Sequence, residues 1–162
     1  MQQSFRGSQS NFSSEGISGR TRGRALVLDT NVALDLLVFR DPACVALAGL
    51  LERAALCWYA VAAMRAEFDD VLGRPAFERW AGQREPIAAQ WARWAVMIEA
   101  APLVTQPSVM RCADPDDQMF LDLSFALRPC CLLSRDRELL RLAEPASTLG
   151  IRIVTPTQFN AP

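Results

Sequence analysis

The sequence predicts an α/β protein in which helices cover both faces of a mostly parallel sheet. Short continuous apolar runs such as Ala25–Leu28 and Cys130–Leu133 are typical of strands buried on both faces. These runs alternate with helical segments, which is the order that crossover connections between parallel strands require. The length of 162 residues, with 51% hydrophobic residues, suits one globular domain.

The first half of the chain supplies two strands and three helices. After the strand Ala25–Leu28, the apolar segment 32–39 predicts a short helix. Asp41-Pro42 then begins a helix that runs to about residue 55, because Asp is a good N-cap and Pro suits the first helical position. Leu56–Val61 reads as the second strand, and Ala62–Leu72 as a helix that ends near Gly73 and Pro75.

The second half repeats this alternation. The pattern predicts, in order, a helix at Pro86–Ala100, an extended segment at Val109–Cys112, a helix at Gln118–Leu127, a strand at Cys130–Leu133, a helix at Arg137–Ala143 and a last strand at Ile151–Val154. We expect residues 1–23 to be a disordered polar leader, because they are rich in Ser, Gly, Gln and Arg, and residues 24–160 to be the folded domain. No apolar run is long enough to predict a membrane span or a secretory signal.

Two residue types are missing, and their absence restricts the chemistry. The chain has no histidine, which excludes Ser-His-Asp and Cys-His catalysis and any His-ligated metal. It has no lysine, since all 17 basic residues are arginine, which excludes Gly-Lys-Ser/Thr phosphate loops and lysine Schiff bases. The net charge of −1 predicts no general attraction for polyanions. The five cysteines have no CxxC spacing, so we expect buried thiols in a reducing cytoplasm.

Acidic residues recur where the predicted strands and helices meet. Asp29 directly follows the first strand, Asp136 follows the strand Cys130–Leu133, Asp117 begins a helix, and Glu67 lies in the helix after the second strand. Ligands of parallel sheets lie beyond the carboxyl ends of the strands, so these side chains can share one space there. Gathered carboxylates need protons or a cation, and oxygen ligands without His or Cys favour Mg²⁺ or Mn²⁺. The chemistry that such a site favours is metal-assisted hydrolysis of phosphodiesters.

At these positions the sequence resembles PIN-domain nucleases, in the bacterial branch that supplies the toxins of toxin–antitoxin pairs. The resemblance covers residues 24–159. It is carried, in order, by Leu28-Asp29-Thr30-Asn31, Ala66-Glu67-Phe68, the segment 114–121 (DPDDQMFL), the segment 132–140 (LLSRDRELL) and the segment 151–156 (IRIVTP).

The resemblance implies a fold, an activity and a site. The fold is a three-layer α/β/α sandwich, and the activity is a Mg²⁺- or Mn²⁺-dependent endoribonuclease that cuts single-stranded RNA in the cytoplasm. By position, the metal-binding and catalytic quartet would be Asp29, Glu67, Asp117 and Asp136, with Asn31 and Ser134 holding the quartet or a metal-bound water. Asp114 and Asp116 flank Asp117, which we favour because Met119-Phe120-Leu121 follows it at the spacing of the family. A protein antitoxin is an implied partner.

The chain departs from the family at one point. Many relatives carry Ser or Thr after the second strand, as a cap of the helix with the glutamate, whereas Ala62-Ala63 stand here. This departure bears on how firmly Glu67 is placed.

Several surface features suggest partners. Arg135 and Arg137 stand beside the expected edge of the sheet and could bind RNA phosphates, although pairing with nearby acids is an equal alternative. The apolar segments 32–39 and 45–56 could form a homodimer or higher-oligomer face, or a groove for an antitoxin helix.

Other interpretations remain open. Singly, Asp29, Asp136 and the Asp114–Asp117 run could be helix caps and turns without any metal. A haloacid-dehalogenase-like phosphatase would need Asp where Asn31 stands, and a response-regulator domain would need a lysine. A degenerate, non-catalytic PIN-like binding module and a DNA-acting nuclease of the same fold are the remaining alternatives.

Overall fold

The computed structural model describes residues 23–99 and 110–159 and confirms the predicted fold class. Its strands form one five-stranded sheet in the order β3-β2-β1-β4-β5, and every neighbouring pair is parallel. The strands are β1 (Arg24–Leu28), β2 (Leu56–Ala60), β3 (Ala95–Met97), β4 (Cys130–Leu133) and β5 (Ile151–Val154). The chain is thus a three-layer α/β structure with β1 at the centre of the sheet.

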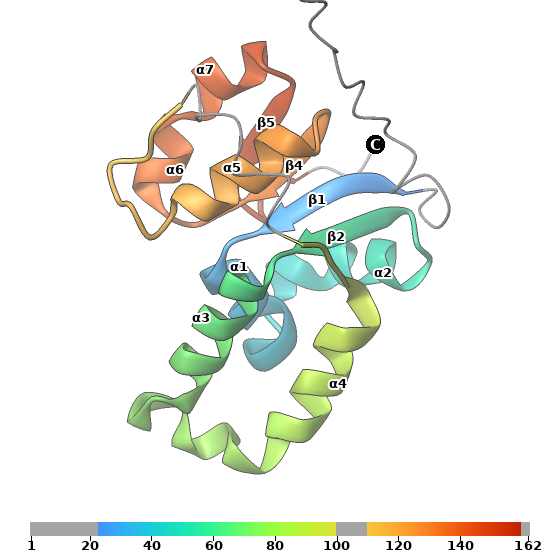
Figure 1. Cartoon of the computed structure of the whole chain (residues 1–162). Helices are drawn as coiled ribbons and strands as arrows, with labels where there is room; N and C mark the ends of the chain where they lie inside the picture. Colours follow the sequence, from blue (N-terminus) through green and yellow to red (C-terminus); the bar gives the residue numbers. More distant parts are fainter. Residues whose placement is uncertain (1–22, 100–109, 160–162) are drawn as a thin grey trace, which may run out of the picture.

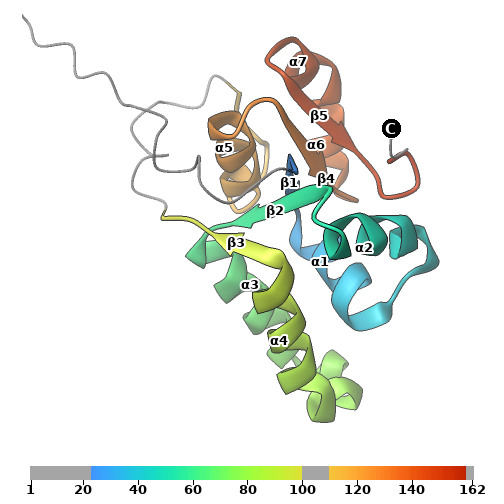
Figure 2. The ribbon, with the colours of Figure 1, turned by 90° about the vertical axis from the view of Figure 1, so that its right-hand side faces the viewer.

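Helices lie on both sides of the sheet, with α5 on one side and α2 on the other (Figure 2). Figure 1 shows α3 and α4 as a pair that extends away from the sheet. The helices are α1 (Thr30–Leu34), the π-helix η2 (Asp35–Phe39), the 3₁₀-helix η3 (Pro42–Cys44), α2 (Val45–Glu52), α3 (Ala62–Gly73), the 3₁₀-helix η4 (Pro75–Gln83), α4 (Arg84–Trp94), α5 (Gln118–Ala126), α6 (Arg137–Arg141) and α7 (Ala143–Thr148).

The register of the central strands fixes where the loops with polar residues begin. Leu28, the last residue of β1, pairs with Leu133, the last residue of β4, and Leu133 also pairs with Val154 of β5. Leu28 and Leu133 are buried, as the continuous apolar pattern of their strands predicts. Asp29 and Ser134 therefore leave the sheet side by side.

Two of the predicted helices end differently from the expectation. The helix predicted at Pro86–Ala100 is wrong beyond Trp94, because Ala95–Met97 forms β3 and pairs with β2. Val96 and its apolar neighbours fit a strand as well as a helix, and pairing with the edge of β2 makes this segment a strand. The helix predicted at Arg137–Ala143 is present as α6 but ends at Arg141, and the pattern did not predict α7, which contains Pro145 in its first turn, where proline is tolerated.

Other expectations fall partly outside the described residues. Residues 1–22, most of the expected leader, lie outside them, as do Ala100 and Val109. The described remainder of the extended segment, 110–112, forms no strand. Instead, the side chain of Gln118 in α5 forms hydrogen bonds with the backbone of this segment. The sequence pattern did not predict η4, in which no residue is buried.

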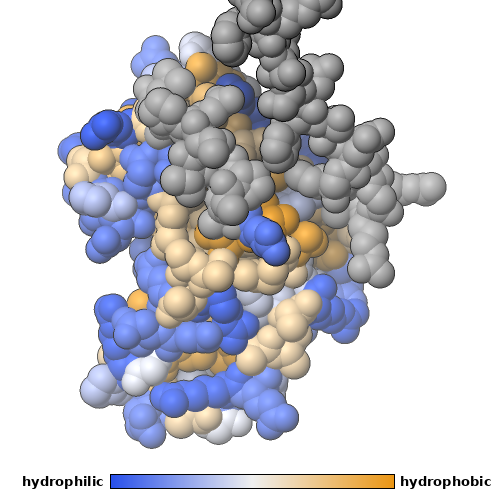
Figure 3. Space-filling model, in the orientation of Figure 1, coloured by the Kyte–Doolittle hydropathy of each residue, from blue (hydrophilic) through white to orange (hydrophobic). Residues whose placement is uncertain are grey.

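The surface and the thiols agree with an ordinary globular core. On the face shown in Figure 3, the part formed by α3, η4 and α4 is largely hydrophilic. None of the helices within the described ranges has the length and apolar character that spanning a membrane requires. All five cysteines are free; three are buried as expected, whereas Cys112 and Cys131 are half-buried. Burial raises the pKa of Cys44 to about 11 and that of Cys130 to about 12.

Gly23 leads into β1 where the chain passes very close to the turn before β2. A Cβ atom at Gly23 would lie 2.8 Å from the carbonyl carbon of Leu56 and 2.9 Å from the carbonyl oxygen of Ala54. We expect Gly23→Ala to lower the free energy of unfolding by about 1–3 kcal/mol, since the backbone must shift. Urea unfolding followed by circular dichroism measures this. Gly82→Ala is the matched control, because no atom lies within 4 Å of its added Cβ. Equal stability of the two variants would contradict the prediction.

Candidate active site

Asp29 lies between β1 and α1, and only 2% of its surface is exposed. Its Oδ1 accepts the backbone N–H of Val32 at 2.7 Å, which makes Asp29 the N-cap of α1. Its Oδ2 accepts the hydroxyl of Ser134 and the backbone N–H of Arg135, the latter at 3.0 Å. A carboxylate offers about four acceptor positions, so these three donors leave room for about one further ligand.

The buried position of Asp29 makes its negative charge costly. Burial raises its pKa, and the hydrogen bonds from Ser134, Val32 and Arg135 oppose that rise. The charged form thus depends on the donors around it. A cation beside the carboxylate would favour the charged form further.

Ser134 connects two of the predicted carboxylates. It is fully buried, and its hydroxyl donates to Asp29 while it accepts the backbone N–H of Asp136 at 2.9 Å. The Oδ1 of Asp136 accepts the N–H groups of Glu138 and Leu139 at 2.7 and 3.2 Å, as the N-cap of α6. Its Oδ2 accepts no hydrogen bond from the described residues, so it is available to a ligand.

Asp117 is at the N-cap position of α5, but its side chain caps nothing. Burial raises its pKa to about 6, together with the negative charges around it. These charges belong, in order of effect, to Asp136, Asp114, Asp29 and Glu67. The residues come from four separate segments of the chain, so the fold has brought their charges into one region.

Glu67 lies in the middle of α3 and is half-buried. Burial raises its pKa, and the charges of Asp29 and Asp116 add to the rise. The hydroxyl of Thr30 and the charge of Arg74 act in the opposite direction. The Thr30 hydroxyl is buried and makes no hydrogen bond of normal geometry within the described part of the chain. It lies close enough to Glu67 to lower the pKa of that carboxylate.

The helix α3, which bears Glu67, begins without a side-chain cap. Val61 occupies the N-cap position of α3 and offers no side-chain acceptor. The helix that bears Glu67 is placed by packing instead, since Met64, Phe68 and Leu72 on the same helix are buried.

The donors at this edge fit a hard divalent cation. All of them are oxygens, which favours Mg²⁺ or Mn²⁺ over Zn²⁺. The pKa values of Asp29, Glu67 and Asp117 are all raised, so each charge is destabilised in a way that a cation would relieve. Across residues 23–99 and 110–159, no three acidic or cysteine side chains already stand close enough together to hold a metal.

The supporting residues predicted from the sequence differ in their surroundings. Asn31 is exposed in the first turn of α1, and its side chain has no hydrogen bond to any described residue. The guanidinium of Arg135 is paired with Asp35 and with Asp41. Arg137, in contrast, is exposed and pairs with no described residue, so it is the arginine that a phosphate could reach.

Gln118 was missed by sequence reasoning. Its Nε2 donates to the carbonyl of Met110 at 3.1 Å and to Asp122 at 2.8 Å, and its Oε1 accepts the N–H of Cys112 at 2.8 Å. The amide thus holds the segment that leads to Asp114 and Asp117. In sequence, a glutamine in the first turn of a helix reads as an exposed residue, and no signal predicts its loop contacts.

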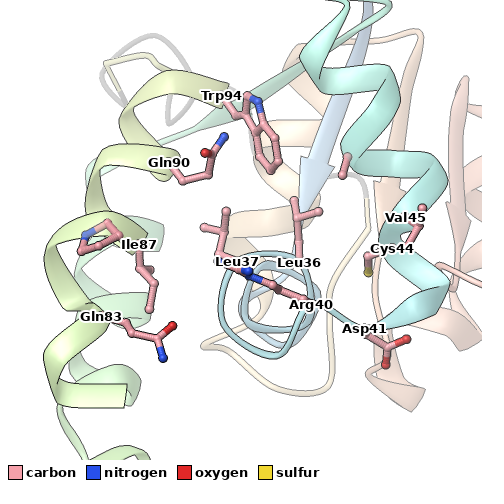
Figure 4. Close-up of a pocket in the computed structure, with 12 residues that line it drawn as sticks. Leu36, Leu37, Arg40, Asp41, Cys44, Val45, Gln83, Ile87, Gln90 and Trp94 are labelled. Atoms are coloured by element: carbon pink, nitrogen blue, oxygen red, sulfur yellow. The ribbon is translucent and has the colours of Figure 1, made fainter.

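One hollow of the surface lies away from these carboxylates. It is a groove of about 400 Å³ between α4 on one side and η2 and α2 on the other (Figure 4). Leu36, Ile87 and Trp94 line it, and Val45 at its rim is 68% exposed. The apolar segments singled out in the sequence therefore do form one wall of a groove.

The crowding of charge around Asp117 predicts that this residue destabilises the metal-free protein. Its pKa is about 6 in the folded protein and 3.8 ordinarily, so the folded state binds more protons between these values. This contribution to stability is lost as the pH rises from about 4 to 6. In a chelator near pH 7, we expect Asp117→Asn to raise the Tm above that of the wild type, with the difference disappearing below about pH 4.

Differential scanning fluorimetry across this pH range measures the effect. Asp70→Asn is the control, because the carboxylate of Asp70 is exposed and pairs with Arg74. A Tm of Asp117→Asn that stays at or below the wild-type value near pH 7 would contradict the prediction.

Comparison with known families agrees with this geometry. A sequence model of the PIN domain family matches residues 25–138, which run from β1 into α6 and contain all four predicted carboxylates. No curated protein matches the chain. The match covers well over half of the chain, and the parallel sheet with acidic residues beyond its carboxyl edge accords with it, so the chain belongs to the PIN domain family, whose members are generally metal-dependent nucleases.

Proposed function

We propose that this chain is a Mg²⁺- or Mn²⁺-dependent endoribonuclease that hydrolyses RNA phosphodiester bonds at Asp29, Glu67, Asp117 and Asp136. The observation that carries the proposal is the convergence of their charges on Asp117, whose pKa burial and these charges together raise to about 6. A protein gains nothing in stability from such an arrangement, so a function that needs a cation accounts for it.

The metal would be held by oxygens that the fold leaves available. These are the remaining acceptor position of Asp29, the Oδ2 of Asp136, and the carboxylates of Glu67 and Asp117, which do not cap a helix. When bound, the cation lowers the pKa of the attacking water and offsets the negative charge that develops on the phosphate.

The chain itself supplies rigidity and solvent exclusion around these oxygens. Ser134 fixes the distance between Asp29 and the backbone of Asp136, because its hydroxyl bonds to both. The Thr30 hydroxyl faces Glu67 without a hydrogen bond of normal geometry to a described residue, and it supports Glu67 or a water beside it. Neither role needs a histidine or a lysine.

RNA as the substrate rests on the resemblance to the toxin branch of the family. Exposed Arg137 is the residue that we assign to phosphate binding. A DNA-acting nuclease and a non-catalytic binding module are the alternatives, and cleavage assays on matched single-stranded RNA and DNA separate the three.

A role as the toxin of a toxin–antitoxin pair is a further part of the proposal. The groove between α4 and α2 is lined mainly by apolar residues, of which Val45 is exposed, and this suits an antitoxin helix or a second copy of the chain. A small antitoxin gene beside the gene of this protein would support the toxin role.

Glu67 and Asp69 provide a matched test of the site, because they lie two residues apart on α3. We expect Glu67→Gln to slow Mn²⁺-dependent cleavage of single-stranded RNA by about 100-fold or more, since a metal ligand is lost. Asp69→Asn should cleave at nearly the wild-type rate, because Asp69 is an exposed partner of Arg65. A fluorescent single-stranded RNA resolved on a gel measures both rates. Wild-type rates in Glu67→Gln would remove Glu67 from the site.

Metal binding should depend on pH through Asp117. Protons compete with the cation for this carboxylate, whose pKa is about 6 without metal. We expect the Kd for Mn²⁺ to be nearly constant above about pH 7 and to rise up to about tenfold per pH unit below about pH 6. Isothermal titration calorimetry measures this, and Asp117→Asn should bind more weakly with a flatter pH dependence. A wild-type Kd that does not change between about pH 5 and 7 would refute the prediction.

A further inference from the structure

We propose that Arg135 is a positioning residue, which ties the turn between β4 and α6 to Asp35 and Asp41 and so fixes the groups around Asp29. The proposal rests on the proposed nuclease function, and it assigns Arg135 a role other than phosphate binding.

The guanidinium of Arg135 binds two carboxylates at once. Its Nε donates to the Oδ2 of Asp35 in a short contact, and its Nη2 donates to the Oδ2 of Asp41 at 3.0 Å. Asp35 is largely buried, with 14% of its side chain exposed, compared with 32% for Asp41. A planar guanidinium suits two directed bonds of this kind, whereas an ammonium acts as a single point charge.

The two acidic partners of Arg135 form one rigid platform. Asp35 begins the π-helix η2, and the chain then turns at Arg40, whose φ of 52° is left-handed. This turn returns Asp41 to Asp35, because the N–H of Asp41 donates to the carbonyl of Asp35 at 2.9 Å. Asp41 also caps η3 through the N–H of Ala43 at 2.7 Å. The platform is therefore set by the backbone and does not depend on Arg135.

The backbone of Arg135 belongs to the site. Its N–H donates to the Oδ2 of Asp29 at 3.0 Å, and the residues on either side are Ser134 and Asp136. Thus the side chain of Arg135 anchors the turn to the platform, while its main chain and its neighbours bind or present the carboxylates. Without the anchor, the turn would keep its hydrogen bonds to Asp29 and Val154 but would lose its link to the platform.

The charges argue against a direct role of Arg135 in phosphate binding. Two carboxylates already surround the guanidinium, so the cluster carries a net charge of −1, from one positive and two negative groups. A phosphate would have to displace one of them. Arg137, two residues further on, has no such partner in the described part of the chain and remains open to solvent.

The test compares Arg135 with Arg137 and with a control, Arg141, from α6. For Arg135→Ala we expect a Kd for Mn²⁺ about 10- to 100-fold higher and a similarly lower kcat, the range usual for residues that orient metal ligands. The affinity for single-stranded RNA in a chelator, from fluorescence anisotropy, should change less than about twofold, since no phosphate contact is lost. Arg137→Ala should instead weaken RNA binding and leave the Kd for Mn²⁺ unchanged. Arg141→Ala, which removes an exposed partner of Glu138, should change neither the affinity for RNA nor the Kd for Mn²⁺.

Two further variants separate positioning from mere folding. Arg135→Lys should recover part of the lost kcat, because lysine can pair with one of the two carboxylates. Removal of Arg135 leaves Asp35 without its counter-charge, which can itself unfold the protein. The triple variant Arg135→Ala, Asp35→Asn, Asp41→Asn removes the stranded charges. It should fold like the wild type and still bind Mn²⁺ as weakly as Arg135→Ala.

The outcomes also distinguish this proposal from the proposed function. Weaker RNA binding in Arg135→Ala, with unchanged kcat and Mn²⁺ affinity, would show a phosphate contact and overturn the positioning role. Wild-type Mn²⁺ affinity in the triple variant would overturn it as well. If the wild-type protein cleaves no RNA, the proposed function fails, and Mn²⁺ affinity still tests Arg135. If the wild-type protein does not bind Mn²⁺ either, amide hydrogen exchange of Arg135 and Asp136 provides the test. We expect exchange at least about tenfold faster in the triple variant than in the wild type. Unchanged exchange would overturn the proposal.

Discussion

The parallel pairing of β1 with β4 is the constraint on which the rest of the structure depends. Because Leu28 and Leu133 end their strands in register, Asp29 and Ser134 leave the sheet as neighbours although they lie 105 positions apart. Neither hydrophobic strand carries any chemistry itself. Their register alone decides which polar side chains meet, and a shift of one residue would turn every side chain of a strand to the opposite face.

Burial and mutual repulsion both destabilise the negative charges of the resulting site. Asp29 is charged only at the cost of desolvation, and Asp117 meets the charges of four other carboxylates. At Asp29 the fold offsets part of this cost through the Ser134 hydroxyl and two backbone N–H groups, although the pKa is still raised. At Asp117 no hydrogen bond is among the causes of the shift, and the pKa is raised to about 6. Local instability at a functional centre, offset by an apolar core elsewhere, is common in enzymes.

Much of the fold could be predicted from the sequence because its signals are local. The run Ala25–Leu28 and its terminal Asp29 read as a buried strand followed by a cap, and both are present. The end of α4 could not be predicted, because Val96 and its neighbours fit either period and only pairing with β2 settles the matter. The helix α7, which packs against β5, was likewise not predicted.

The candidate site could be predicted less completely than the fold. Its four carboxylates stand at element ends and could be selected from the sequence, whereas the partners that hold them could not. The Arg135–Asp35 pair joins residues 100 positions apart, and no periodicity connects them. Gln118 reaches Met110 across a loop that has no regular structure. Such contacts are set only after the chain has folded.

The double use of some acidic residues bears on how function would be lost in evolution. Asp29 and Asp136 are also helix caps, so a chain that no longer bound a cation would still need them to begin α1 and α6. Glu67 and Asp117 cap nothing in the described structure, and relief from selection would let them drift first. When related sequences are sorted into working and decayed enzymes, the first pair is therefore nearly uninformative, and the second pair is diagnostic.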